Sequence, residues 1–515
     1  MREHPARSQS DDDHFTDRDL SAAHSLQAKA GAHRRDPRCH PPVTGRSLCC
    51  LIVLGLLVMV PFSVAGADQE PAGRGELPDR PKIRFYRWQE DWSVLADPSL
   101  RTGFLDSWKY IPLSARDPAR YLSLGLNLRE RFELNDATSF GVGNNKSDRY
   151  LLQRFQIHAD LRLDSHWQIF AQFEDVRALE KAVITPVDKN EFDLRQAFVA
   201  YVDAVAGGVL KVRVGRQEMA FDLQRFVSVR DGPNVRQAYD AVWLDWERER
   251  WRFITFWSQP VQYRSGHPFD DFSDTHFQYG GVRVERQDVG PGALSAYYSR
   301  FHLDKVSYLG ASGDERRDIL DVRYAGAGGG LDWDLEAMGQ AGHVGNADVR
   351  AWALGTRSGY TFADARWAPH LWLQVDAASG DHNLKDHVLG TFNPLFPNGY
   401  YVTLSGYTGY VNFIHVKPGL TIRPTPKLSL LSAVGFQWRE TTADAVYVQP
   451  NIPVRGTAGK PGRWTGMYVQ LRAEWAITPN LAGALEAVNF QVGGALRRAG
   501  GHDANYLGVE LNYGW

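Results

Sequence analysis

The chain has 515 residues, a formal net charge of −2 and a mean hydropathy of −0.38. This polar average argues against a bundle of transmembrane helices, and the near-neutral charge argues against a dedicated nucleic-acid binder, which carries a basic patch. Aromatic residues make up 12% of the chain, too many for a disordered protein. Combined richness in glycine and aromatics is typical of large β proteins.

The first part of the chain carries an export signal. The apolar run at 48–60 is too short to span a bilayer as a helix, which takes about 20 residues. Arg46 precedes this run, and the small residues Ala65-Gly66-Ala67 follow it. This order predicts a secretory signal peptide at 46–67 that is cleaved near Ala67.

The residues before the signal peptide show no hydrophobic period. We expect 1–45 to be a disordered leader or the product of a mis-called start. All 3 cysteines, Cys39, Cys49 and Cys50, precede the predicted cleavage. The exported chain is therefore not a disulfide scaffold.

The last residues alternate strictly between apolar and polar. From Leu507 to Trp515 every second residue is apolar, which predicts a strand with one apolar and one polar face. The segments 120–134 and 149–163 show the same alternation and are long enough to cross a membrane, which takes about 9–11 residues in a tilted strand. An edge strand of a soluble sandwich is the alternative for the last segment alone.

About 18 segments of this kind run through the chain, joined alternately by short and mostly long connections. Short turns on one side and long loops on the other are typical of outer-membrane barrels. We therefore predict an all-β fold, a transmembrane antiparallel up-and-down β-barrel of outer-membrane type, at 120–515. The strands are expected near 120–134, 149–163, 166–176, 192–202, 209–219, 239–247, 250–258, 276–286, 292–302, 315–325, 331–341, 349–360, 367–378, 408–423, 427–439, 464–477, 480–490 and 504–515.

The polar face of such strands must face a water-filled lumen, because the other face meets lipid. Fixed arginines in a pore select anions, whereas arginines paired with carboxylates could equally form a structural ladder. The strand parities place these basic residues in the lumen: Arg129, Arg131, Arg154, Arg162, Arg195, Lys211, Arg213, Arg323 and Arg472. Acidic residues interleave with them, including Asp193 and Glu474.

Four motifs stand out in this chain: Gly215-Arg216-Gln217, Asn234-Val235-Arg236, Arg87-Trp88-Gln89-Glu90 and Phe392-Asn393-Pro394-Leu395-Phe396-Pro397. With these motifs the chain resembles the alginate export family of bacterial outer-membrane proteins. The resemblance covers most of 85–515. It implies a monomeric eighteen-stranded barrel with an electropositive constriction that passes a polyuronate.

The resemblance also implies which residues form the constriction. They are Arg216 and Gln217, followed by Arg225, Arg230 and Arg236 in the connection after the Gly-Arg-Gln turn. That connection carries as many acids as arginines. A salt-bridged loop that plugs or braces the barrel is therefore the alternative.

The leading functional hypothesis is an outer-membrane channel for an anionic saccharide or another anionic solute. It needs no cofactor or metal and no nucleic acid; its partners would be outer-membrane lipid, the solute and, for export, a periplasmic protein. One alternative is a porin for uptake of small solutes, and another is a receptor barrel closed by 379–407. A barrel hydrolase with His158 as its base is the enzymatic alternative, but no nucleophile motif accompanies it.

The segment 68–119 precedes the first strand and is rich in proline and aromatics. Aromatic side chains in such number need a partner surface. We expect this periplasmic segment to pack on the barrel rim or to enter the barrel as a partial plug.

Overall fold

The computed structural model describes residues 81–143 and 147–515. The predicted leader, signal peptide and cysteines lie outside the described residues. Among the described residues, no helix is long and apolar enough to cross a membrane.

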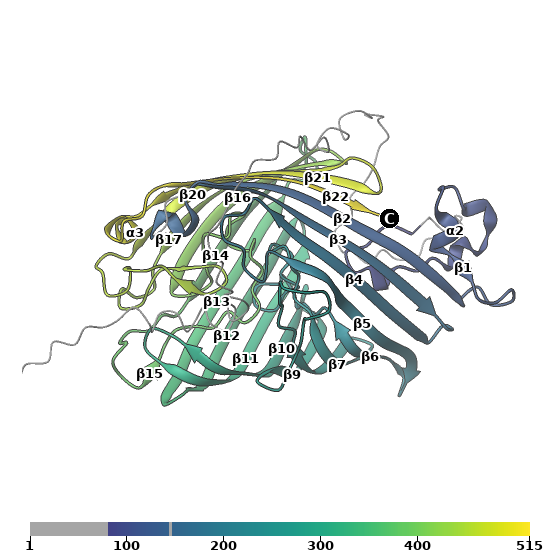
Figure 1. The fold of residues 1–515 in the computed structure, drawn as a ribbon, viewed down its shortest axis with the longest axis horizontal. Coiled ribbons are helices and arrows are strands. Elements are labelled where there is room, and N and C mark those ends of the chain that lie inside the picture. The colour runs from purple at the N-terminus through teal and green to yellow at the C-terminus, as the bar shows by residue number, and fades with distance from the viewer. Residues whose placement is uncertain (1–80, 144–146) are drawn as a thin grey trace, which may run out of the picture. The chain divides into compact units, whose positions relative to one another are not determined.

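The described chain folds mainly into one sheet (Figure 1), antiparallel except for the pairing of β13 with β15. This sheet holds 20 strands, and without the two-residue strands β1 (Ile111–Pro112) and β15 (Val388–Leu389) 18 remain. They are β2 (Tyr121–Asn135), β3 (Asp148–Arg162), β4 (Trp167–Leu179), β5 (Asn190–Val205), β6 (Gly208–Gln217), β7 (Tyr239–Arg248), β8 (Trp251–Pro260), β9 (Phe277–Val289), β10 (Gly292–Ser307), β11 (Ser312–Gly328), β12 (Leu331–Val344), β13 (Ala347–Thr361), β14 (His370–Ala378), β16 (Phe413–Thr425), β17 (Leu428–Trp438), β20 (Trp464–Ala476), β21 (Leu481–Val492) and β22 (Ala504–Gly514).

The sheet closes on itself. Each of these strands pairs with its neighbour in the chain, and β22 pairs back onto β2, with Tyr513 opposite Leu128. Closure leaves no unpaired edge, as a barrel in lipid requires. The predicted eighteen-stranded barrel is confirmed. Predicted and observed strand starts differ most at β16, which begins at Phe413 and not at residue 408, because 408–412 is buried in the interior and does not join the wall.

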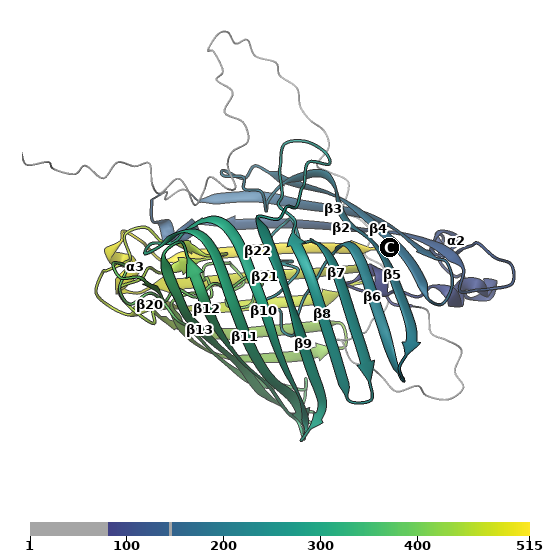
Figure 2. The ribbon, with the colours of Figure 1, turned by 90° about the horizontal axis from the view of Figure 1, so that it is seen from below.

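Few residues lie in other elements. They are η2 (Arg87–Gln89), η3 (Ser93–Ala96), η4 (Pro98–Leu100), α2 (Asp106–Lys109), η5 (Thr138–Gly141), α3 (Gly494–Arg498) and the hairpin of β18 (Tyr447–Val448) and β19 (Ile452–Pro453). Figures 1 and 2 agree that α2 lies beside the C-terminus at one end of the barrel and α3 at the other. Short turns connect strands at the α2 end, and most connections at the α3 end are long.

The apolar residues of the alternating pattern form the outer face of the barrel. On β22, Leu507, Val509 and Leu511 are exposed, and so are five tryptophans on or next to the strands, namely Trp167, Trp251, Trp257, Trp367 and Trp475. Tyr150, near the start of β3, does not belong to this outward-facing group. It is buried inside the barrel because its hydroxyl donates to Glu133 (2.5 Å).

Candidate functional site

Two long loops fold into the barrel and meet there. The loop 218–238 follows β6, and the loop 379–412 joins β14 to β16. They pair through their backbones, since Phe396 N donates to Phe226 O (2.9 Å) and Ser228 N donates to Phe396 O (3.0 Å). Both phenylalanines are buried in one apolar cluster with inward side chains of the wall. We call these two loops the inserted loops.

Arginines of the wall fix the first inserted loop by its backbone. Arg129 Nη1 donates to Asp231 O (2.8 Å), and Arg154 Nε donates to Asn234 O (2.7 Å). Arg195 Nη1 donates to Arg236 O (2.5 Å). Three of the predicted lumen arginines thus bind the loop 218–238.

The carboxylate of Asp231 lies among these guanidiniums. Arg154 Nη1 is 2.6 Å from Asp231 Oδ1, and Arg236 Nε is 3.5 Å from the same oxygen. Burial alone would raise the pKa of Asp231, but the charges of Arg154, Arg236 and Arg129 outweigh it and hold that pKa well below its ordinary value. Asp231 is therefore ionised and pairs with the wall.

Asn234, which is not among the predicted site residues, also anchors the first inserted loop. It is fully buried, and its Nδ2 donates to the carbonyls of Arg177 (2.9 Å) and Asp188 (3.0 Å). Its Oδ1 accepts from Arg129 Nη2 (3.2 Å). Its place in the Asn-Val-Arg motif was the only signal for this role.

Arg225 ties the same loop to the opposite wall. Its Nε donates to Tyr401 of the second inserted loop (2.7 Å), and Glu336 of β12 pairs with its Nη1. Arg323 on β11 lies 2.8 Å from Asp222 of the loop. Arginines of both wall and loop therefore brace the insertion across the barrel.

Other predicted site residues form ion pairs or hydrogen bonds within the wall. Arg131 pairs with Glu133, Glu486 and Glu510 at 2.6, 2.5 and 2.9 Å. The remaining wall contacts are Arg472 with Glu474 (2.6 Å), Arg216 with Asp240 (2.8 Å), Arg162 with Asp160 (3.1 Å) and Gln217, which donates to Ala241 O (3.1 Å). Arg236 pairs with Glu218 (2.8 Å) within the first inserted loop.

Two predicted site arginines differ from these, because no described carboxylate forms an ion pair with them. Arg213 lies under aromatic rings instead, with the Trp88 ring centroid 4.3 Å from its Cζ, and its buried Nη1 has no hydrogen-bond acceptor. Arg230, in the first inserted loop, is partly exposed, and its backbone N–H donates to Ser228 Oγ (2.9 Å). These cations are the least neutralised in the predicted set.

The N-terminal segment contacts the same region. Phe85 lies over Arg236, 4.1 Å from its Cζ, and Trp88 packs against the inward-facing Phe198. Arg162 Nη2 donates to Trp88 O (2.9 Å). Arg87 Nη2 donates to Trp515 O (2.8 Å), which joins this segment to the end of the last strand.

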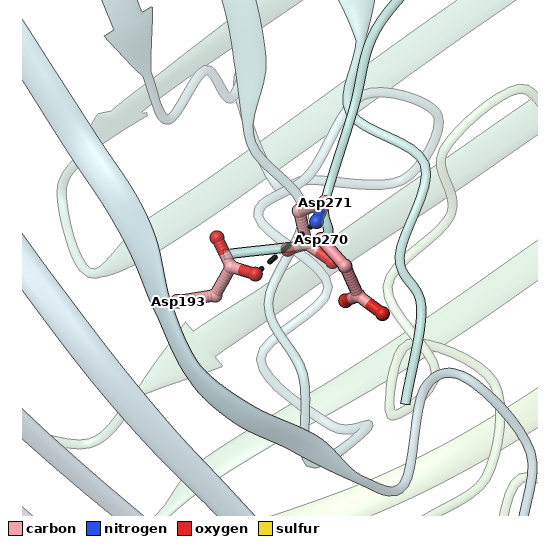
Figure 3. A group of neighbouring side chains, drawn as sticks. All are labelled: Asp193, Asp270 and Asp271. Atoms are coloured by element: carbon pink, nitrogen blue, oxygen red, sulfur yellow. Dashed lines mark hydrogen bonds between the residues drawn. The ribbon is translucent and has the colours of Figure 1, made fainter. Parts of the chain in front are cut away.

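Three carboxylates lie together, those of Asp193 on β5 and of Asp270 and Asp271 in the loop 261–276 (Figure 3). Their oxygens lie within 4.8 Å of one another, and Asp271 N donates to Asp193 Oδ2 (3.2 Å). Burial, together with the negative charge of Asp193, raises the pKa of Asp271 to about 6, although the positive charge of Arg195 opposes this shift. Carboxylate oxygens suit a hard cation, but Arg195 Nη2, 3.5 Å from Asp271 Oδ2, already supplies a positive charge.

His158 would be the base of a barrel hydrolase. It is buried, and its ring stacks on Phe170 with the centroids 5.5 Å apart. Its surroundings are thus those of a packed wall residue.

Residues 120–510 match the model of the alginate export family. The chain belongs to the alginate export family. Family and fold together are those of an outer-membrane channel. A search of curated proteins finds no significant match.

Solved structures of proteins from Pseudomonas aeruginosa share the fold of this member of the alginate export family. OccK2 (OpdF) in complex with glucuronate is 12% identical, with a TM-score of 0.50 over 76% of this chain and 96% of that chain. OpdK with vanillate is 11% identical, with a TM-score of 0.50 over 76% of this chain and 98% of that chain. At these identities the likeness concerns the fold alone.

Proposed function

We propose that this protein is a passive outer-membrane channel for an anionic solute, with an alginate-like polyuronate as the leading case. The observation that carries the proposal is Arg213, a lumen cation without a carboxylate partner and with a free buried N–H. Charge-assisted hydrogen bonds to carboxylates are strong, and fixed arginines select anions in pores. A uronate carboxylate supplies the acceptor that Arg213 lacks.

The N-terminal segment would act as a plug over this cation. Trp88 lies over Arg213, which forms no ion pair with a described carboxylate, and Phe85 lies over Arg236, which also pairs with Glu218. A cation–π contact is worth about 0.5–1 kcal/mol at an exposed site and about 2 kcal/mol or more where the cation is desolvated. A hydrogen bond between a charged donor and a carboxylate contributes a comparable amount, about 1.5–3 kcal/mol, so a uronate can compete with the Trp88 ring for Arg213.

Block of single-channel current by an oligouronate tests the proposal. Arg213→Gln should weaken the block about tenfold or more, since a hydrogen bond to a charged group contributes about 1.5–3 kcal/mol. Lys211→Gln is the matched control, because it removes the same charge from the same face of β6, where Lys211 already pairs with Glu247 (2.9 Å). Unchanged block in Arg213→Gln, or equal block by a neutral oligosaccharide of the same length, would contradict the proposal.

Uptake of a small anion is the second candidate. OccK2, whose structure contains glucuronate, shares this fold, and the inserted loops narrow the lumen of the present barrel. Liposome swelling distinguishes the candidates: entry of monouronates but not of oligouronates favours uptake of small solutes. A barrel that binds uronate without conducting ions would instead be a closed receptor.

A further inference from the structure

The outer face of the barrel changes from apolar to charged at one level on four neighbouring strands. On β11 the outward residues Val322 and Leu320 are followed, towards the long loops, by Asp318 and Arg316. The register places Arg300 opposite Asp318 and His343 opposite Arg316. On β13, Arg350 likewise follows the exposed Trp352.

This level lies at the outer leaflet. Long loops of outer-membrane barrels are extracellular and short turns are periplasmic, and these charged residues lie on the long-loop side of the apolar band. Side chains here meet lipid headgroups rather than acyl chains.

A hollow of about 870 Å³ opens on the same face. Gly280 lies at its base and has no side chain to fill it, and the exposed Trp257 and Val282 line its apolar part. Arg300, Arg316, His302, His343 and Asp318 line its charged part. The hollow thus joins an apolar surface to a mainly basic one.

The basic part of the hollow includes an arginine that no described carboxylate neutralises. Arg300 is paired with Asp318 (2.7 Å), but no ion pair with a described residue involves Arg316, which is exposed. A guanidinium at headgroup level with no carboxylate partner suits a phosphate, which it can bind through two parallel hydrogen bonds.

We propose that this hollow binds the phosphorylated headgroup of an outer-leaflet glycolipid. Arg316, with His343 opposite, contacts the phosphate, and an acyl chain lies over Trp257 and Val282. Basic pockets on membrane proteins bind lipid headgroups in this way. The site is on the outside of the wall and is independent of transport through the lumen.

Binding of a fluorescent lipid A to the purified full-length protein in detergent micelles tests the proposal. The double variant Arg316→Gln/His343→Gln should weaken binding at least tenfold. Arg286→Gln is the matched control, because it removes an outward arginine of β9 near the opposite, short-turn end and should leave the affinity unchanged. Equal affinity of the wild type and the double variant would overturn the proposal.

Two further measurements separate headgroup from chain. Val282→Trp fills the hollow without changing its charge and should also weaken lipid A binding. Dephosphorylated lipid A should bind as weakly to the wild type as lipid A does to the double variant. Competition by inorganic phosphate at micromolar concentration, with Val282→Trp having no effect, would identify a free phosphate site and overturn the lipid assignment.

Discussion

Arg154 shows how one side chain can hold a loop of the lumen. Its three nitrogens donate to Asn234 O, to Asp231 Oδ1 and to Pro233 O at 2.7, 2.6 and 2.8 Å. Leaving the buried carbonyl of Asn234 without its hydrogen bond alone costs about 1–3 kcal/mol. Because these bonds come from the side chain, and the backbone pairing of Arg154 with Arg129 and Val176 stays in place, we expect this cost to loosen the loop rather than to unfold the barrel.

The variant Arg154→Gln should therefore speed amide hydrogen exchange in 218–238 while leaving the wall protected. Arg300→Gln, which removes an arginine from the outer face, is the control and should leave exchange in that loop unchanged. Unaltered exchange in the loop of Arg154→Gln would show that the other anchors suffice.

Asp271 gives the lumen a pH dependence. A carboxyl whose pKa is raised from 3.8 to about 6 holds its proton more tightly in the folded protein, so its contribution to stability is greatest below 3.8 and is lost as the pH rises to 6. Between pH 7 and pH 5 Asp271 becomes neutral, and Arg195 loses a counter-charge. Anion preference in reversal-potential measurements should rise over this interval with a midpoint near 6.

The variant Asp271→Asn checks that assignment. At pH 7 it should already show the anion preference that the wild type shows at pH 5. A full pH step in Asp271→Asn would assign the titration to another group, of which Glu218 is the first to test because burial also raises its pKa.

At the scale of elements, the N-terminal segment is the part that deletion can remove without cutting a wall strand. Deleting 81–105 takes away Phe85, Arg87 and Trp88, and with them the contacts to Arg236, Trp515 and Arg213. Single-channel conductance should rise. Phe85→Ala/Trp88→Ala, which keeps the segment but removes its rings, should give a smaller rise, and unchanged conductance in the deletion would rule out a plug.

The wall strands could be predicted from the sequence because their signal is local. A period of two over many residues places Arg129, Arg154 and Arg195 on one face, whatever lies across the barrel. The partners of these arginines could not be predicted. Arg129 meets Asp231 102 residues further along the chain, a contact that depends on how the loop folds.

The course of the inserted loops could not be predicted from local sequence patterns for a second reason. Loop sequences usually lie at a surface, yet Phe392 and Phe396 are buried in the barrel interior. The balance of acids and arginines in 218–238 did indicate a salt-bridged loop, and the pairs of Arg225 and Arg236 agree with that alternative. The unpaired state of Arg213 followed from no pattern, because it depends on the ring of Trp88.

At the scale of the whole molecule, the net charge of −2 conceals an ordered distribution. Arginines and acids of the lumen are largely paired with each other, the outer face is apolar, and charge returns on that face at the long-loop end. Such a distribution requires export to the outer membrane. N-terminal sequencing of the membrane-inserted protein should show a chain that begins just after Ala67, and an uncleaved chain would contradict the predicted signal peptide.

Whether the lumen passes anions is decided by the reversal potential of the wild-type channel in a planar bilayer under a tenfold potassium chloride gradient. We expect a reversal potential with the sign of chloride permeation, which moves towards zero in Arg213→Gln. A reversal potential with the sign of potassium permeation would contradict this expectation.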